Sequence, residues 1–189
     1  MNKTRKIIFE AAIKVFSSNG YESATMDEVA SKAGVAKGTL YYHFKSKEEL
    51  FYFIVQSGID LISDEVSKAI EEVDDPIERM KVAARLQLKY FYTNKDLFRV
   101  IMTHMWGSKE RHEEIRSQMK SLIDLTSKTL SETKKDSDKD KEDYDILSYC
   151  FIGILFSSAL YEIINENNYD QNEVVEKFIN YINYGIRLS

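Results

Sequence analysis

The chain has 189 residues, of which 43% are hydrophobic and 30% are charged, and it contains one proline, one cysteine and seven glycines. This composition excludes collagenous, low-complexity and disulfide-framed proteins. The formal net charge of −5, taken alone, argues against a nucleic-acid partner.

The scarcity of proline and glycine and the many Lys, Glu, Ala, Leu and Ile residues predict an all-α fold. Residues 4–18 form an amphipathic helix that ends at Gly20. Thr25 opens a capping box, in which a hydroxyl and a carboxylate satisfy free backbone donors at the start of a helix that runs to about residue 33. A third short helix is expected at about 36–44.

Six further helices are expected, which makes about nine in all. They span about 46–72, 76–92, 94–107, 109–131, 145–164 and 171–187. Residues 132–143 contain no apolar side chain and predict a mobile loop. We therefore expect a small helical domain at 1–47 and a larger helical domain at 48–189.

The most apolar stretch, residues 146–161, raises the question of a membrane span. Its sixteen residues would extend roughly 24 Å at about 1.5 Å per residue, which is less than the ~30 Å hydrocarbon core of a bilayer. Both flanks are acidic, so there is no positively charged anchor. We expect a buried helix without membrane association, with Cys150 as a small core residue inside it.

The cysteine count also bears on the cellular compartment. A lone Cys150 cannot form an internal disulfide, which favours a reducing cytoplasm. Charge returns at Glu10 and Lys14 within the first apolar stretch, so we expect no secretory segment.

Residues 25–47 have the pattern of a helix-turn-helix. Gly34 supplies the turn, and Ala30 is small where the two helices would cross. The apolar residues that can close a shared core are Val29, Val35, Leu40 and Phe44. Steps of 100° along the second helix from an inward Leu40 place Ala36 and Phe44 on the same side.

The opposite side of that second helix is unusual for a surface that meets only water. It carries Gly38, Thr39, Tyr41 and Tyr42, with Lys37 and His43 on its flanks. Such a face suits the major groove of DNA, where the tyrosine rings and the threonine methyl can touch thymine methyls or the sugar-phosphate wall. Lys37 can reach either guanine O6 and N7 or a phosphate, and His43 is either a phosphate donor or a packed surface histidine.

The distribution of charge supports this interpretation. Residues 1–47 contain eight Lys and Arg but only four Asp and Glu, a net charge of +4, so the remainder carries −9. A basic segment of this kind can release counterions from DNA, which makes its affinity depend on salt.

The segment resembles the DNA-binding domain of the TetR/AcrR (tetracycline-repressor-like) family. The resemblance rests on Thr25-x-x-x-Val29-Ala30, on Ala33-Gly34-Val35 and on Lys37-Gly-Thr-Leu-Tyr-Tyr-His-Phe-Lys-Ser-Lys-Glu-Glu-Leu50. It implies that Thr25 and Lys47 hold phosphates, while Lys37, Thr39, Tyr41, Tyr42 and His43 face bases or the backbone. Ala36 stands where family members often have serine, so one hydroxyl contact to phosphate is missing. Two-fold dimers of this family read half-sites about one helical turn, ~34 Å, apart.

The same resemblance implies a ligand-responsive transcriptional regulator: a repressor that a small hydrophobic or aromatic effector releases from a palindromic operator. The effector would bind in the 48–189 domain, and its candidate contacts are Phe91, Met102, Trp106 and Tyr149. For any single one of these side chains, plain core packing is the more common role; as a set they allow an apolar, aromatic-lined pocket. We expect no enzymatic activity, no cofactor and no metal, since His104 and His112 lack the spacing of a metal site.

The last two helices, at about 145–166 and 171–187, are rich in apolar positions. They either complete the core or, as we favour, form a homodimer interface, because a two-fold contact buries the same patch twice. The alternative function is a constitutive DNA-binding architectural or auxiliary protein without an effector. Stabilisation against heat by hydrophobic compounds would distinguish the two.

Overall fold

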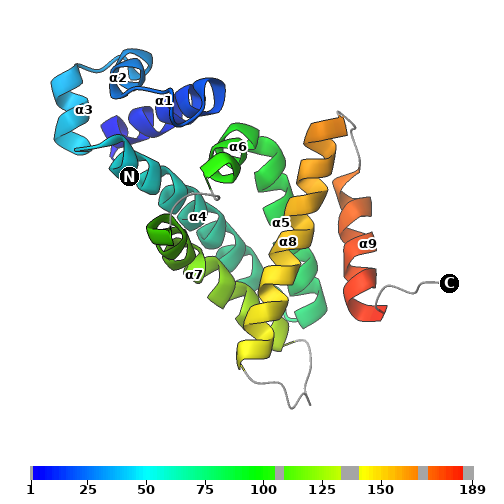
Figure 1. The fold of residues 1–189 in the computed structure, drawn as a ribbon. Helices are drawn as coiled ribbons and strands as arrows, with labels where there is room; N and C mark the ends of the chain where they lie inside the picture. Colours follow the sequence, from blue (N-terminus) through cyan, green and yellow to red (C-terminus); the bar gives the residue numbers. More distant parts are fainter. Residues whose placement is uncertain (1, 105–108, 133–140, 166–169, 185–189) are drawn as a thin grey trace. The chain divides into compact units, whose positions relative to one another are not determined.

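The computed structural model describes residues 2–104, 109–132, 141–165 and 170–184. Within these ranges the chain forms nine α-helices and no strand, so the predicted all-α fold is confirmed (Figure 1). The helices are α1 Lys3–Asn19, α2 Met26–Ala33, α3 Lys37–His43, α4 Lys47–Glu71, α5 Pro76–Thr93, α6 Lys95–His104, α7 Lys109–Ser131, α8 Lys141–Asn165 and α9 Gln171–Tyr184.

Local sequence signals account for most helix ends. The Asp75 carboxylate accepts a hydrogen bond of 2.8 Å from the Glu78 N–H at the start of α5, as expected for an N-cap that precedes a proline. The largest difference is α8, which begins at Lys141 rather than near residue 145. Of the expected loop at 132–143, residues 133–140 lie outside the described residues.

The chain divides into two compact units. Unit 1 comprises Met1–Ile59 and Asn94–Met119, and unit 2 comprises Asp60–Thr93 and Lys120–Ser189. Both α4 and α7 contribute residues to each unit.

Unit 1 is built on α1, which packs against α2 and α6, while α2 packs against α3 (Figure 1). Fully or almost fully buried side chains from four helices form its core: Ile8, Phe16, Val29, Leu40, Phe44 and Phe51. The predicted core residue Val35 is only half-buried. This core fixes α3 against the rest of unit 1, which determines the face that α3 leaves exposed.

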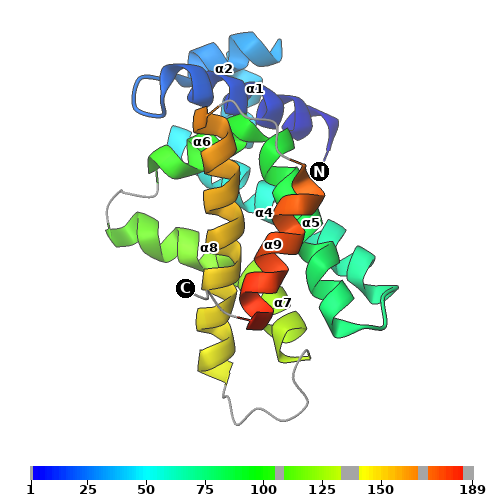
Figure 2. The same ribbon diagram turned by 90° about the vertical axis from the view of Figure 1, so that its right-hand side faces the viewer.

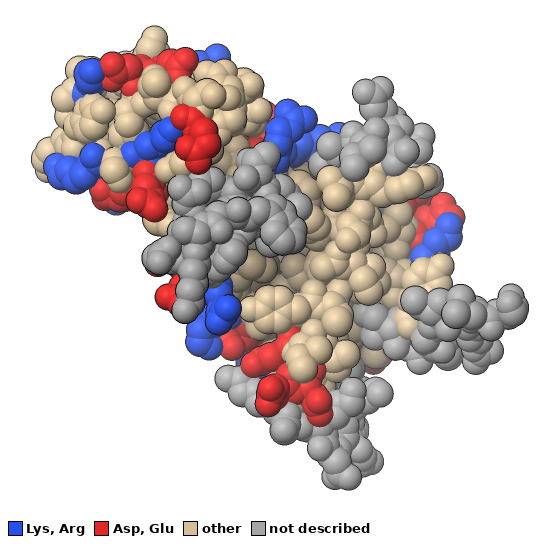
Figure 3. Space-filling model, viewed as in Figure 1, with Lys and Arg blue, Asp and Glu red and all other residues tan. Residues whose placement is uncertain are grey.

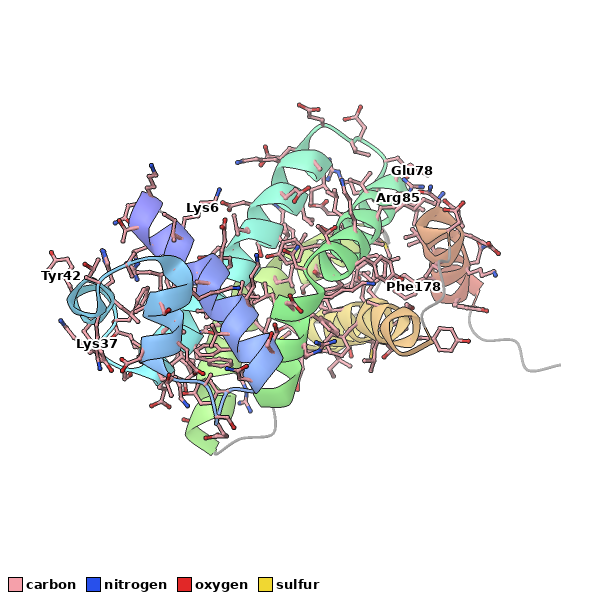
Figure 4. All side chains as sticks on the ribbon, turned by 90° about the horizontal axis from the view of Figure 1, so that it is seen from above. Lys6, Lys37, Tyr42, Glu78, Arg85 and Phe178 are labelled. Carbon is pink, nitrogen blue, oxygen red and sulfur yellow. The ribbon has the colours of Figure 1, made fainter. Side chains whose placement is uncertain are left out.

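In unit 2, α5 packs against both α8 and α9 (Figure 2). The rings of Phe151 and Phe178 lie 5.0 Å apart, and the Arg85 guanidinium bonds the Glu176 carboxylate at 3.1 Å. Figure 4 shows Arg85 and Phe178 in this part of unit 2. The packing of α5, α8 and α9 therefore combines an aromatic contact with an ion pair.

The expected burial of α8 is wrong in part. Residues Glu142–Tyr161 have the length and mean hydropathy, 1.4, of a membrane-crossing helix, yet only 33% of that window is buried. Cys150 is exposed instead of lying in the core. The exposed large apolar side chains of α8 are Ile146, Leu147, Tyr149, Ile154 and Tyr161. Figure 3 shows this side of α8 with few charged atoms beyond the acidic residues near its start. One long apolar helix fits a core helix with an uncovered face as well as it fits a membrane span.

Candidate nucleic-acid interface

The third helix, α3, presents two different faces. Leu40 and Phe44, at the end of the helix, are completely buried in the core of unit 1, whereas Tyr41 is 38% and Tyr42 is 77% exposed. Figure 4 shows Tyr42 and Lys37 projecting away from the ribbon. A tyrosine that is three-quarters exposed adds little to packing, so the predicted outward face exists as an available surface.

The neighbouring predicted contacts lie on or beside this face. Gly38 is exposed, and a Cβ placed on it would meet no atom within 4 Å, so the backbone is open to a partner. Thr39 and His43 are half-buried, and the His43 ring meets the Tyr42 ring edge-on at 5.2 Å. Ala36 does not share the inward side as expected. It is exposed because it precedes the first turn of α3 in an extended conformation, where the 100° step does not apply.

Gly34 sets the direction of α3. Its backbone is left-handed, with φ 65° and ψ 30°, and its N–H donates to the carbonyls of Ala30 and Ser31 at the end of α2. The Val35 N–H also donates to the Ala30 carbonyl, at 3.1 Å. Glycine enters this conformation without the cost that a Cβ imposes. The turn predicted at Gly34 is therefore confirmed.

Thr25 forms the predicted capping box at the start of α2. Its hydroxyl accepts from the Glu28 N–H at 3.2 Å and donates to the Glu28 carboxylate at 2.9 Å. The same carboxylate oxygen accepts from the Thr25 N–H at 2.8 Å. The hydroxyl hydrogen of Thr25 is thus donated to the Glu28 carboxylate. Thr25 can donate it to a phosphate only if this hydrogen bond to Glu28 breaks.

Lys37, the first residue of α3, is paired with an acidic residue of α2. Its ammonium donates to the Asp27 carboxylate at 2.7 Å, and the two side chains remain 62% and 58% exposed. The hydrogen bond that Lys37 donates to Asp27, and then the negative charge of Asp27, raise the pKa of Lys37 above its ordinary value. Lys37 therefore stays charged, but its charge is locally balanced.

Lys47, at the start of α4, is engaged inside unit 1. Its ammonium donates to three backbone carbonyls in the connection between α1 and α2: Tyr21 at 2.7 Å, Glu22 at 2.9 Å and Ala24 at 3.0 Å. It also lies 4.6 Å from the centre of the Tyr21 ring. An ammonium has three donor hydrogens, so all of them are used. A phosphate contact by Lys47 requires one of these bonds to break.

The internal partners of these cations were missed at the sequence level. So was Arg5, whose guanidinium lies over the Phe44 and Phe53 rings at 4.9 and 4.3 Å. Asp27 is ten residues from Lys37, and the carbonyls that hold Lys47 are more than twenty residues from it. Helical periodicity links residues three or four apart, so only the three-dimensional fold reveals these pairs.

A small cavity lies in unit 2. Its volume is about 10 Å³, room for about one water molecule, and its lining includes Val66, Met80, Ala83, Thr126, Thr129 and Phe151. Both threonine hydroxyls donate to carbonyls of their own helix, α7, at 2.8 and 2.9 Å. The cavity is smaller than the ~300–1,000 Å³ typical of pockets for drug-sized ligands.

Two of the predicted effector contacts, Phe91 and Tyr149, have described side chains, and neither is among the described residues that line this cavity. Phe91 is half-buried, and its ring meets Phe156 at 6.1 Å within unit 2. Tyr149 is 49% exposed on α8. The side chain of Met102 and the whole of Trp106 lie outside the described residues.

Among the described residues, no group of three or more His, Cys, Asp and Glu is placed to hold a metal ion. The side chains of His104 and His112, which were considered for such a site, lie outside the part of the structure that is described.

Comparison with known proteins gives consistent matches. Residues 8–52 match the family described as bacterial regulatory proteins, tetR family. A solved protein of Clostridium perfringens, described as a candidate regulator of fatty acid metabolism, is 35% identical; the match covers 97% of this chain and 100% of that chain, with a TM-score of 0.82.

Two further proteins are less similar in sequence. The HTH-type transcriptional activator FasR of Mycolicibacterium smegmatis is 27% identical over 167 residues, which are 88% of this chain and 75% of that protein. The fold is also similar to that of the transcriptional regulator FadR from Bacillus subtilis, solved in complex with stearoyl-CoA. That match has 20% identity, a TM-score of 0.86, and coverage of 96% of this chain and 99% of that one.

Proposed function

Because the chain belongs to the TetR family of bacterial regulatory proteins and is therefore a DNA-binding transcriptional regulator, we propose that it acts as a dimeric repressor which an acyl-coenzyme A releases from a palindromic operator. It would do so in the cytoplasm, where its DNA target lies.

The DNA contacts are proposed for the exposed face of α3. Tyr42 carries this assignment, because it is the most exposed of the large hydrophobic side chains described. The other proposed contacts lie on the same helix, and an α-helix fits the width of the major groove: they are Lys37, Gly38, Thr39, Tyr41 and His43. Thr25 and Lys47 are proposed to stand beside the phosphates, where their internal bonds compete with any such contact.

The effector class is proposed from likeness and from the interior of unit 2. The C. perfringens protein, similar over its full length, is described in connection with fatty acid metabolism, and the B. subtilis FadR structure holds stearoyl-CoA. A long acyl chain suits a cavity with apolar lining such as Val66, Met80 and Phe151.

The size of the cavity supports a mechanism by population shift. A cavity of about 10 Å³ cannot hold a stearoyl chain, since pockets for drug-sized ligands span ~300–1,000 Å³. The acyl chain would therefore bind a form of unit 2 with separated helices. An effector that prefers this expanded form draws the population away from the form that binds DNA. We propose α4 as the mechanical link, since this one helix contributes residues to both units.

A buried amide offers a polar anchor for such a ligand. Gln87 is 1% exposed, and its Oε1 atom is buried without a hydrogen-bond partner among the described residues. It follows Ala83 by one turn on the same face of α5. A buried acceptor without a partner is costly, and an effector with an N–H or O–H donor beside it would remove that cost.

The dimer is proposed to form through α8 and α9. Ile154 is 45%, Tyr161 is 52% and Tyr181 of α9 is 54% exposed. Gly153 lies on the same side of α8 as Ile146 and Ser157, and a Cβ on it would meet no described atom of a neighbouring helix within 4 Å. A second copy could approach closely at Gly153 and cover this apolar face.

Ligand-dependent melting tests the effector. We expect stearoyl-CoA at 100 times its Kd to stabilise the full chain by about 2.7 kcal/mol, which raises the melting temperature by roughly 5–11 °C, while free coenzyme A does less. Ala83→Val, which adds two methyl groups beside the cavity, should reduce the shift and keep DNA binding. If stearoyl-CoA, stearate and shorter acyl-CoAs all fail to stabilise the protein, the constitutive DNA-binding protein is the better description.

Selection of bound sites from random DNA tests the operator. We expect a palindrome whose half-sites lie about one helical turn apart. Addition of the acyl-CoA should then release the selected duplex. Tighter binding on addition would instead identify an effector that acts as a co-repressor or an activating ligand.

A further inference from the structure

The contact between Lys37 and Asp27 has a consequence for sequence specificity. The two side chains meet at 2.7 Å across the helix-turn-helix, from the first residue of α3 to the first turn of α2. Both stay more than half exposed, and exposed ion pairs contribute little to folding. The pair therefore needs an explanation other than stability, and it stands on the surface that reads DNA.

Asp27 makes the Lys37 ammonium a poor partner for phosphate. An ammonium has three donor hydrogens, of which Asp27 takes one. A phosphate oxygen on either remaining hydrogen would lie only about 4.5 Å from the Asp27 carboxylate oxygen, given ordinary hydrogen-bond lengths. Two negative groups at that separation repel each other. The charge that would attract Lys37 to any DNA is thus locally balanced.

A base edge escapes this penalty. Guanine O6 and N7 are neutral acceptors, and in the major groove they can take the two remaining hydrogens of a lysine ammonium. The Asp27 bond also restricts an otherwise flexible four-carbon side chain, so less conformational entropy is lost on contact.

We propose that Asp27 is a specificity-determining residue, whose carboxylate directs the Lys37 ammonium toward the O6 and N7 of a guanine and away from the phosphate backbone. Asp27 itself is a positioning residue in this assignment, because it acts on DNA through Lys37. The proposal depends on DNA binding by α3, and it is independent of the effector.

The test compares two duplexes of equal length: one selected from random DNA by the wild-type protein, and one with the same bases scrambled. For Asp27→Asn, affinity for the scrambled duplex should rise and its salt slope should steepen by about 0.9, as for one added phosphate contact. Over a fourfold salt range, such as 50 to 200 mM, that slope corresponds to about a 3.5-fold change. The ratio of specific to non-specific affinity should fall accordingly.

Two controls separate this effect from bulk charge and from damage to the fold. Glu10→Gln removes one exposed carboxylate from α1 and should leave the affinity ratio unchanged. In a Lys37→Gln background, Asp27→Asn should no longer alter the ratio, and Lys37→Gln alone should relax the preference for guanine at one position in each half-site. A thermal melt of each variant confirms folding.

Several outcomes would overturn the proposal. Glu10→Gln and Asp27→Asn could change the ratio equally, which would make the effect one of net charge. Asp27→Asn could leave the ratio of specific to non-specific affinity unchanged. It could also change that ratio as much in the Lys37→Gln background as in the wild-type protein. Wild-type DNA binding by every variant of α3, including Tyr42→Ala, would instead show that α3 does not read DNA, and it would overturn the proposed DNA contacts together with the role of Asp27.

Discussion

Removal of the Lys47 ammonium tests whether this residue supports the fold or holds DNA. Lys47→Met keeps the apolar part of the side chain and leaves the carbonyls of Tyr21, Glu22 and Ala24 without their shared donor. A hydrogen bond to a charged group contributes about 1.5–3 kcal/mol. The three bonds share one charge and the Glu22 contact is exposed, so water recovers part of the loss. We expect a loss of about 3 kcal/mol, or roughly 6–12 °C in melting temperature.

The assay combines a thermal melt with DNA affinity measured from 50 to 200 mM salt. If Lys47 joins α4 to the α1–α2 connection, Lys47→Met should melt early and bind operator more weakly at every salt concentration, with an unchanged salt slope. Lys47→Arg should restore only part of the stability, because a planar guanidinium cannot direct three donors from one nitrogen.

The result that would refute this reasoning is also specific. A melt like that of the wild type, together with a salt slope flatter by about one unit, would identify Lys47 as a phosphate contact. The family resemblance favours that role, and the three carbonyl bonds in the structure oppose it.

Three other predictions concern different surfaces. Tyr42→Ala should weaken operator binding with little change in melting temperature, because the side chain is 77% exposed; unaltered affinity would contradict its role. Gly153→Arg should give a monomer in sedimentation, since its site is open in one chain and would be covered by the second copy in the proposed dimer, whereas Gly153→Ala should remain dimeric; a dimeric Gly153→Arg would place the interface elsewhere. Burial, and then the charge of Glu65, raise the pKa of Tyr90 to about 12 from an ordinary value near 10. The folded protein holds that proton longer than the unfolded chain, so the stability due to the neutral phenol is present below pH 10 and is lost as pH rises toward 12. Urea midpoints of Tyr90→Phe should fall less over this range than those of the wild type, and parallel curves would contradict the assignment.

Local signals in the sequence were sufficient for much of the fold. The Thr25 capping box and the Gly34 turn both act over a few residues, and both are confirmed. The errors arose where the outcome depends on packing. Ala36 was assigned by helical periodicity to a position that precedes the helix. Cys150 was placed in the core because its helix is apolar on nearly all sides, and the sequence does not reveal which side the other helices leave uncovered.

The candidate site was predictable to a similar extent. Helical geometry places Tyr41 and Tyr42 opposite Leu40, and their exposure agrees with it. The partners of Lys37 and Lys47 were beyond prediction, because the direction of the chain after Gly34 and the path of the α1–α2 connection decide them. These contacts join residues ten and more than twenty positions apart.

The contacts also change what the charge of residues 1–47 means for DNA binding. The net charge of +4 counts every cation equally. Lys47 faces three carbonyls, Arg5 lies over two aromatic rings and Lys37 is balanced by Asp27. Non-specific attraction must then rest more on exposed lysines such as Lys6 of α1 (Figure 4). Since attraction to phosphate and selection of bases use different side chains, a substitution at Lys6 should lower affinity for all DNA alike, whereas one at Asp27 should change the preference between sequences.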